Sequence, residues 1–278
     1  MTVTQDIKEQ LKHIKHFALD MDGTIYNGST LFPFTNDFLK QLKSQGIGYS
    51  FLTNNPSKSI TDYLKHLDKM GITATKEEMY TSAVATINYI KNYHPSVKRL
   101  FILGTPSMIK EFEDAGFIST ADNAEDRPDA LVIGFDTSLI YSRLCRAAYW
   151  ASQQLPYFAT NPDWVCPTDQ PNILVDCGSI CACIEGATKR KPDIVIGKPD
   201  PQMLDGIIQK YGLKPNEIAM VGDRIYTDVQ MAKNAGALGV LVLSGEATVT
   251  DVHESTVKPD IVARDLAELQ ELIQKAHA

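Results

Sequence analysis

The sequence lacks any long apolar run and any concentration of positive charge. None of its apolar runs approaches the roughly 20 residues that span a bilayer, and the start of the chain, from Met1 to Lys15, is polar and charged. We therefore expect a cytoplasmic protein without a membrane partner. Lys and Arg number 27 against 34 Asp and Glu, a formal charge of −7, and no basic cluster stands out. Nucleic acid is excluded as an expected partner, because phosphate contacts need clustered cations.

Cysteine is scarce, and its placement suggests neither a disulfide framework nor a metal site. The 278 residues contain five cysteines, an odd number in a long chain. Cys177, Cys181 and Cys183 lie close together but lack the paired C-x-x-C spacing and the nearby histidine of a zinc site, so we interpret them as part of a small-residue segment. The six histidines form no ligand pattern and are expected at the surface. Burial is the expectation for Trp150 and Trp164, with stacking on a ring of a bound substrate as the alternative.

Short apolar runs alternate with helical patterns from end to end. This alternation is typical of a mainly parallel sheet covered by helices, so the predicted fold class is α/β. Helical spacing predicts one helix that ends near Gly71, one that runs from Pro201 to Gly212, and one at 266–276. Strands are predicted at 17–19, 47–52, 100–103, 130–133, 157–159, 194–196, 218–221, 240–243 and 261–262.

An acidic turn follows the first predicted strand. The apolar run 17–19 leads into Asp20-Met21-Asp22-Gly23-Thr24, and ligand sites of parallel sheets lie beyond the carboxyl ends of their strands. Residues two apart in an extended segment point the same way, so Asp20 and Asp22 can face one site. Two close carboxylates repel each other unless one is protonated or a cation offsets the charge. A pair of solvated turn aspartates is the alternative reading of this pentapeptide.

Three further apolar runs end in residues of the kinds that phosphate chemistry uses. They lead into Thr53-Asn54-Asn55, into Gly197-Lys198-Pro199, and into Gly222-Asp223 with Asp228 shortly after. Each taken alone also reads as a helix cap, a surface charge or a turn. Taken together, carboxylates from separate strands indicate Mg²⁺. A lone lysine among them would stabilise both an aspartate and a bound phosphate.

In this order, the motifs resemble those of the haloacid dehalogenase superfamily, in the branch of NagD-like and p-nitrophenylphosphatase-like phosphatases. The first motif corresponds to Asp20, Asp22, Gly23 and Thr24, the second to Thr53 and Asn54, the third to Lys198, and the fourth to Gly222, Asp223 and Asp228. The resemblance covers nearly the whole chain. It implies a doubly wound, Rossmann-like core formed by residues 1–79 and 187–278. Residues 80–186 would form an inserted α/β cap domain that closes over the active site and governs substrate choice.

The resemblance also implies the chemistry. Asp20 would attack phosphorus to form an aspartyl phosphate, and Asp22 would protonate the leaving oxygen and later deprotonate water. The carboxylates of Asp20 and Asp223 and the backbone carbonyl of Asp22 would bind Mg²⁺, with Asp228 in support. Thr53, Asn54, Asn55 and Lys198 would bind the phosphate. The expected substrate is a small phosphorylated metabolite, such as a sugar phosphate or a nucleotide monophosphate.

Within the predicted cap, Thr160-Asn161-Pro162-Asp163 is similar to a loop of this branch. Asn161 and Asp163 are therefore candidates for closing on the substrate or the core, with an Asn-Pro turn capped by Asp as the alternative. Some pyridoxal phosphate phosphatases of the branch carry His-Pro where this chain has Cys166-Pro167, which weakens a pyridoxal phosphate assignment. Resembling proteins often dimerise through the cap, so a homodimer is an open expectation.

Two other functions use similar residues. A phosphomutase or another phosphotransferase would return the phosphoryl group from Asp20 to a substrate instead of to water. A phospho-acceptor signalling module also phosphorylates an aspartate at a strand end, but it is a single small domain that explains neither the insertion nor Asp22. A P-loop is excluded, because the position six residues before Lys198 is Pro192 and not the glycine that the motif requires.

Overall fold

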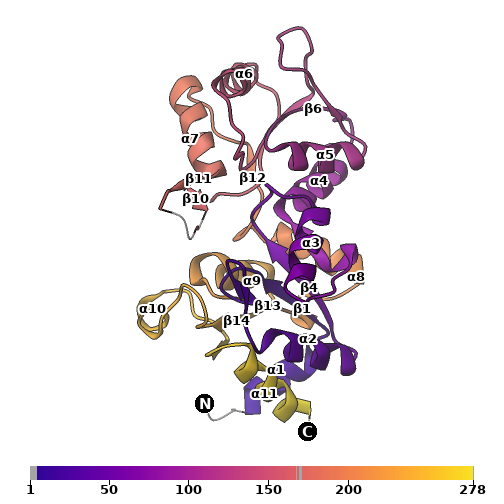
Figure 1. Cartoon of the computed structure of the whole chain (residues 1–278), viewed down its shortest axis with the longest axis vertical. Coiled ribbons are helices and arrows are strands. Elements are labelled where there is room, and N and C mark those ends of the chain that lie inside the picture. Colours follow the sequence, from indigo (N-terminus) through magenta and orange to yellow (C-terminus); the bar gives the residue numbers. More distant parts are fainter. Residues whose placement is uncertain (1–4, 167, 169–170, 278) are drawn as a thin grey trace. The chain divides into compact units, whose positions relative to one another are not determined.

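The computed structural model describes residues 5–166, 168 and 171–277, and the chain divides into two compact units (Figure 1). The first unit contains Met1–Leu52, His66–Tyr80 and Lys198–Ala278, and the second contains Thr53–Lys65 and Thr81–Gly197. Each unit has a mainly parallel sheet with helices, which confirms the α/β fold class. Among the described residues, no helix is long and apolar enough to cross a membrane.

The first unit is built on a six-stranded sheet with β1 near its centre. The strand order is β15-β14-β13-β1-β4-β5, and β1 pairs in parallel with both β13 and β4. All five residues of β1 are buried, as expected for a strand covered on both faces by helices. The strands are β1 (His16–Asp20), β4 (Gly48–Thr53), β5 (Met79–Thr81), β13 (Ile218–Gly222), β14 (Leu238–Val242) and β15 (Ile261–Ala263).

The helices of the first unit accompany this sheet. The structure confirms the helices predicted near Gly71 and Gly212, and both glycines adopt positive φ values, 82° and 63°, just beyond a helix end. The helices are α1 (Gln5–His13), α2 (Thr35–Ser44), α8 (Gln202–Tyr211), α9 (Gln230–Ala235), α10 (Val249–Glu254) and α11 (Leu266–His277), with α3 (Ile60–Lys69) shared by both units. A small antiparallel hairpin, β2 (Tyr26–Asn27) and β3 (Thr30–Leu31), follows β1.

The second unit has a parallel five-stranded sheet in the order β12-β9-β8-β6-β7. Side chains alternate between its faces: Phe101 and Leu103 of β6 pack with Trp150 on one side, while Leu100 and Ile102 pack with Phe112 on the other. The strands are β6 (Arg99–Leu103), β7 (Ile118–Ser119), β8 (Ala130–Ile133), β9 (Tyr157–Ala159) and β12 (Ile194–Val195). The helices are α4 (Ser82–Tyr93), α5 (Pro106–Asp114), α6 (Tyr141–Ser152) and α7 (Cys177–Thr188).

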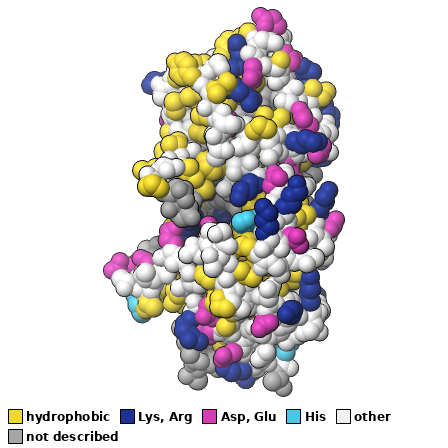
Figure 2. Space-filling model, in the orientation of Figure 1, with side chains coloured by type: hydrophobic (Ala, Val, Ile, Leu, Met, Phe, Trp, Pro, Cys, Tyr) yellow, Lys and Arg dark blue, Asp and Glu magenta, His cyan; other side chains and the backbone are white. Residues whose placement is uncertain are grey.

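Part of the second unit's surface is apolar. A short antiparallel hairpin, β10 (Val165–Cys166) and β11 (Leu174–Val175), precedes α7. Figure 2 shows hydrophobic side chains gathered over this hairpin, α6 and α7. The large hydrophobic residues exposed there are Ile140, Tyr141, Tyr149, Trp164, Val165, Ile173 and Val175. Trp150 is buried as expected, whereas Trp164 is 64% exposed, so its predicted burial was wrong.

The expectation that every histidine lies at the surface was also wrong. His16 begins β1 and is only 3% exposed. Its Nε2 lies 2.9 Å from Oγ of Ser50 on β4, and its ring packs against Tyr211 with the ring centroids 4.5 Å apart. A lone histidine in the sequence gives no sign of such partners, because the pairing of β1 with β4 brings them together.

Candidate active site

The site begins at the carboxyl ends of the parallel strands of the first unit. Asp20 is the last residue of β1, and its register partner on β4 is Leu52, directly before Thr53. On the other side, Leu19 pairs with Val221 of β13, two residues before Asp223. Because carboxyl ends of parallel strands meet at one edge, three of the motifs named from the sequence continue from adjacent strands.

Three carboxylates converge at this edge. One oxygen from each of Asp20, Asp223 and Asp228 lies within 4.8 Å of the other two. Asp20 is 9% exposed, and the other two are buried more deeply. Asp228 belongs to the helical turn Ile225–Val229, which returns the chain toward β13, and its Oδ2 accepts a hydrogen bond from Arg224 N–H (3.1 Å).

Lys198 supplies a buried positive charge to this cluster. Its Nζ donates hydrogen bonds to Oδ1 of Asp20 and to Oδ1 of Asp228, the latter at 2.6 Å. Burial alone would lower the pKa of Lys198, but the charges of Asp20 and Asp228 outweigh burial and raise it. We conclude that Lys198 is charged. Lys198 contacts two of the three carboxylates, and the charge of Arg224 also acts on Asp223, so two positive charges act on three negative ones when all three acids are ionised.

Asp223 provides a direct indication that the cluster fits a cation. Its Oδ2 accepts a hydrogen bond from Glu246 N–H (2.7 Å), whereas its buried Oδ1 has no hydrogen-bond partner among the described residues. Burial raises the pKa of Asp223 and of Asp228, and the neighbouring Asp20 carboxylate adds to both shifts. Carboxylate oxygens are preferred ligands of Mg²⁺ and Ca²⁺, so Asp20, Asp223 and Asp228 can hold such an ion.

The structure places Asp22 differently from the other acids. Its side chain is exposed, and its Oδ1 accepts a hydrogen bond from Gly28 N–H (3.2 Å) in the hairpin turn. Gly23 has φ 84°, which lets the chain turn after Asp22, and a Cβ on Gly23 would meet Oδ2 of Asp223 at 2.3 Å. The Asp22 carboxylate is therefore outside the cluster of three, and the metal contact expected of its backbone carbonyl stays a prediction.

The second predicted motif lies in the second unit and is held there by side chains. Asn54 Nδ2 donates to Oδ2 of Asp163 (3.0 Å), and Ser82 Oγ donates to the Asn54 carbonyl (2.6 Å). Thr53 Oγ1 accepts from Asn55 N–H (3.2 Å). Asn55 Nδ2 contacts Cys166 Sγ at 3.6 Å; Pro167, named with Cys166 in the sequence, lies outside the described residues.

The cap candidates form part of the same network. Asn161 is fully buried, and its Nδ2 donates to Oδ2 of Asp163 (3.2 Å) and to Oδ1 of Asp176 (3.1 Å). Asp176 caps α7, and burial raises the pKa of its carboxyl to about 6. Asn54, Asn161, Asp163 and Asp176 therefore form one polar network at the carboxyl end of β9.

One loop at the site was missed in the sequence. Ser244–Ala247 follows β14, and it contacts both acidic turns: Ser244 Oγ donates to the Gly23 carbonyl (2.7 Å), and Ala247 N–H donates to the Asp223 carbonyl (3.0 Å). The sequence held a signal for this loop, because the predicted strand at 240–243 leads into Ser244-Gly245, and the predicted strands that lead to the site are likewise followed by a polar residue or a glycine.

Comparisons with known proteins agree with this geometry. A family model described as haloacid dehalogenase-like hydrolase matches residues 17–118, and a second HAD-like model matches 195–269. The acid sugar phosphatase of Staphylococcus aureus is 31% identical over 258 residues, covering 93% of this chain and 97% of that protein.

Solved structures are also similar over nearly the whole chain. The 4-nitrophenylphosphatase of Thermotoga maritima has a TM-score of 0.90 and 40% identity, covering 95% of this chain and 99% of that one. The glycerol phosphate phosphatase of Mycobacterium tuberculosis in complex with magnesium has a TM-score of 0.86 and 30% identity, covering 94% of this chain and 78% of that one. The chain therefore belongs to the haloacid dehalogenase-like hydrolases, in the branch of NagD-like and p-nitrophenylphosphatase-like enzymes, and is a phosphatase of that family.

Proposed function

We propose that the protein hydrolyses a small phosphomonoester in a Mg²⁺-dependent reaction through an aspartyl phosphate on Asp20. The observation that carries the proposal is the buried cluster of Asp20, Asp223 and Asp228, with Lys198 donating to two of them and with no hydrogen-bond partner for Oδ1 of Asp223 among the described residues. The magnesium in the Mycobacterium tuberculosis relative supports the choice of ion. When bound, Mg²⁺ would offset negative charge on the carboxylates and on the substrate phosphate.

In this proposal, Asp20, Lys198 and Asp22 have different roles in the transfer of the phosphoryl group. Oδ2 of Asp20 attacks phosphorus, while Lys198 holds Oδ1 of the same carboxylate and orients it. Lys198 also reduces the repulsion between this carboxylate and the phosphate dianion. Asp22, which is exposed and two residues beyond the nucleophile, protonates the leaving oxygen and then takes a proton from the attacking water.

The remaining predicted residues bind substrate or ion. Thr53, Asn54 and Asn55 contribute hydroxyl, amide and N–H groups to the phosphate. Asp20, Asp223 and the carbonyl of Asp22 hold Mg²⁺, with Asp228 in support through its bond to Lys198. In the same proposal, residues 80–186 form the inserted cap that selects the leaving group, and residues 1–79 and 187–278 form the core. The expected substrate is a sugar phosphate or a nucleotide monophosphate.

A phosphate-release screen over a panel of phosphomonoesters tests the function. Wild-type protein should release phosphate from at least one compound with Mg²⁺ and much less after chelation. Asp20→Asn should lower the rate at least about a thousandfold, because the nucleophile is removed. Asp37→Asn is the matched control, since Asp37 is an exposed acid that faces Lys40 on α2. Equal release by wild type and Asp20→Asn would disprove the proposal.

Product analysis separates hydrolysis from phosphoryl transfer. Each phosphomonoester is incubated with a tenfold excess of a different alcohol as acceptor, and free phosphate, released alcohol and new phosphomonoesters are quantified. A hydrolase gives one phosphate for each alcohol released. Isomeric or transferred phosphomonoesters without free phosphate would instead identify a phosphomutase or phosphotransferase with the same intermediate.

A further inference from the structure

The loop Ser244–Ala247 holds one oxygen of Asp223. Glu246 N–H donates to Oδ2 at 2.7 Å, and Ala247 N–H donates to the backbone carbonyl of the same aspartate at 3.0 Å. A Cβ built on Gly245 would lie 2.0 Å from Oδ2, so the backbone of the loop lies directly against the carboxylate. The loop therefore occupies Oδ2 and leaves Oδ1, which is buried and unpartnered among the described residues, for another ligand.

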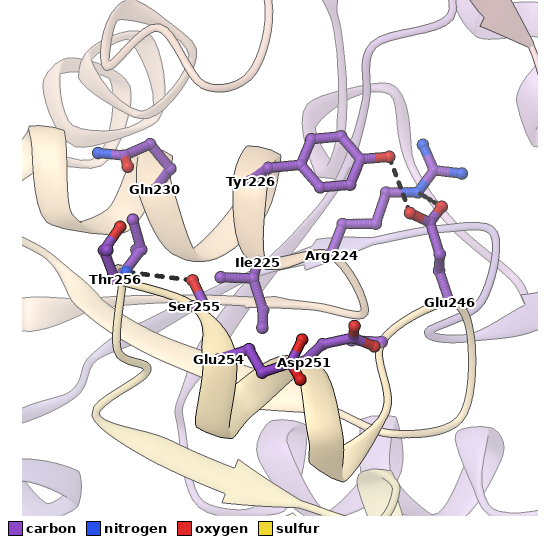
Figure 3. A pocket seen from close by; sticks show the side chains of 11 residues that line it. Arg224, Ile225, Tyr226, Gln230, Glu246, Asp251, Glu254, Ser255 and Thr256 are labelled. Atoms are coloured by element: carbon purple, nitrogen blue, oxygen red, sulfur yellow. Dashed lines mark hydrogen bonds and ion pairs between the residues drawn. The ribbon is translucent and has the colours of Figure 1, made fainter.

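The side chain of Glu246 ties this loop to the segment that follows Asp223. Its Oε2 lies 2.8 Å from Nε of Arg224, and its Oε1 accepts a hydrogen bond from the Tyr226 hydroxyl at 2.9 Å (Figure 3). We call these three residues, Arg224, Tyr226 and Glu246, the Glu246 clamp. Arg224 and Tyr226, the two partners of Glu246, lie within three residues of Asp223, so the clamp fixes the loop against the turn that carries the Asp223 carboxylate.

An ordinary surface ion pair contributes little stability, usually less than about 1 kcal/mol. The Glu246 clamp differs because both carboxylate oxygens are engaged, by two residues on the same turn. Groups that orient a metal ligand without touching the metal typically change metal affinity by about 10-fold to 100-fold. A clamp at this position is suited to control the orientation of Asp223.

We propose that the Glu246 clamp positions Asp223 as a metal ligand and thereby sets the affinity of the protein for its divalent cation. Glu246 is a positioning residue in this scheme, since its side chain touches neither the carboxylate cluster nor any reacting atom that the site provides. The inference rests on the proposed function, because it takes Asp223 to be a ligand. It predicts that disrupting the clamp weakens cation binding while leaving turnover at saturating Mg²⁺ within about threefold of wild type.

Charge alone makes the opposite prediction at one member of the clamp. Removing the positive charge of Arg224 would strengthen the binding of a nearby cation if only long-range electrostatics mattered. If the clamp positions Asp223, replacing Arg224 frees the Glu246 side chain and lets the loop Ser244–Ala247 shift, which weakens the binding of the cation. The sign of the change in Arg224→Gln therefore distinguishes positioning from charge.

A second comparison controls for the loss of a negative charge. Glu254 is the last residue of α10 and lines the same open cavity of about 660 Å³ as Glu246 (Figure 3). Glu254→Gln removes the same charge as Glu246→Gln without touching the loop at Asp223. Tyr226→Phe, which removes one exposed hydroxyl and no charge, tests the clamp in a variant that should fold normally.

The experiment is a titration with MgCl₂ alone by isothermal calorimetry, repeated as a Mg²⁺-dependent rise in melting temperature. Glu246→Gln and Arg224→Gln should raise the Kd for Mg²⁺ by about 10-fold or more, Tyr226→Phe by about threefold, and Glu254→Gln by less than twofold. Melting without Mg²⁺ reports whether each variant is folded. A Kd for Arg224→Gln and Tyr226→Phe equal to or below that of wild type overturns the inference. Wild-type protein that binds no Mg²⁺ overturns the proposed function, and the inference with it.

Discussion

Burial of His16 predicts a loss of stability in mild acid. The side chain is only 3% exposed, and burial, with a smaller effect of the Lys210 charge, lowers its pKa from 6.5 to about 4. The folded protein therefore prefers the neutral imidazole more strongly than the unfolded chain does. The stability that this preference gives is present above pH 6.5 and is lost as the pH falls toward 4. Replacing His16 with glutamine removes the titration and keeps an amide able to reach Ser50.

The two pKa values set the size of the effect. One pKa unit corresponds to about 1.4 kcal/mol, so the full shift contributes about 3 kcal/mol. Between pH 7 and pH 5, proton uptake by the unfolded chain should lower the free energy of unfolding of wild type by about 2 kcal/mol from this residue alone. His16→Gln should lack this component, although its stability at pH 7 will be reduced by the lost packing against Tyr211.

The assay is chemical denaturation of both proteins at half-unit steps from pH 7.5 to pH 4.5, without metal. The difference in unfolding free energy between wild type and His16→Gln should shrink by about 2 kcal/mol as the pH falls from 7 to 5. Asp223 and Asp228 titrate equally in both proteins and cancel in the difference. Parallel pH profiles for the two proteins would show that His16 keeps an ordinary pKa and would refute this reasoning.

Three other substitutions have distinct expected outcomes. Lys198→Met leaves buried carboxylates uncompensated, so chemical denaturation without metal at pH 7.5 should show that the free energy of unfolding falls by about 3–5 kcal/mol. Steady-state assays should show a rate at least a hundredfold lower, which corresponds to about 3 kcal/mol in the barrier. If neither value changed, the contacts of Lys198 would be contradicted. Gly245→Ala should lower turnover at least tenfold, because the new Cβ would meet Oδ2 of Asp223 at 2.0 Å. Gly28→Ala is the comparison: Gly28 has open space around it but φ 58°, so melting experiments should show a loss of only about 1 kcal/mol in the free energy of unfolding. Asp176→Asn should stabilise the protein by up to about 3 kcal/mol at pH 8 and by nothing at pH 3.5. The reason is that the buried wild-type carboxyl has a pKa of about 6, so its ionisation destabilises the folded protein as the pH rises from 4 to 6. A variant less stable than wild type at pH 8 would argue against this prediction.

Two of the predicted acids share one physical basis: Asp20 and Asp223 each follow an apolar run, and the neighbouring parallel strands β1 and β13 bring their carboxyl ends to one edge, with Asp228 on the turn after β13. Lys198 also follows an apolar run, but its strand, β12, pairs with β9 in the other sheet. Composition and spacing are enough to locate such residues. The predicted strands at 100–103, 130–133 and 157–159 agree closely with β6, β8 and β9 for the same reason, because buried parallel strands are continuous apolar runs.

What the sequence did not predict depends on contacts between distant segments. His16 meets Ser50 through strand pairing, and Glu246 meets Arg224 and Tyr226 through the meeting of two loops. Hairpins of two-residue strands, such as β10 and β11, are too short to show a period. The exposure of Trp164, directly before this hairpin, also depends on distant segments, since tryptophan is buried only where a partner surface covers it.

The position of β1 in its sheet has a consequence for synthesis on the ribosome. This strand is made among the first twenty residues, but one of its two neighbours, β13, lies about two hundred residues later in the chain. The second unit is nearly continuous in sequence, so all of it leaves the ribosome before β13 does. A nascent chain can therefore fold the inserted unit first, while the strand that ends in Asp20 keeps one edge unpaired until β13 has been made, about four fifths of the way along the chain.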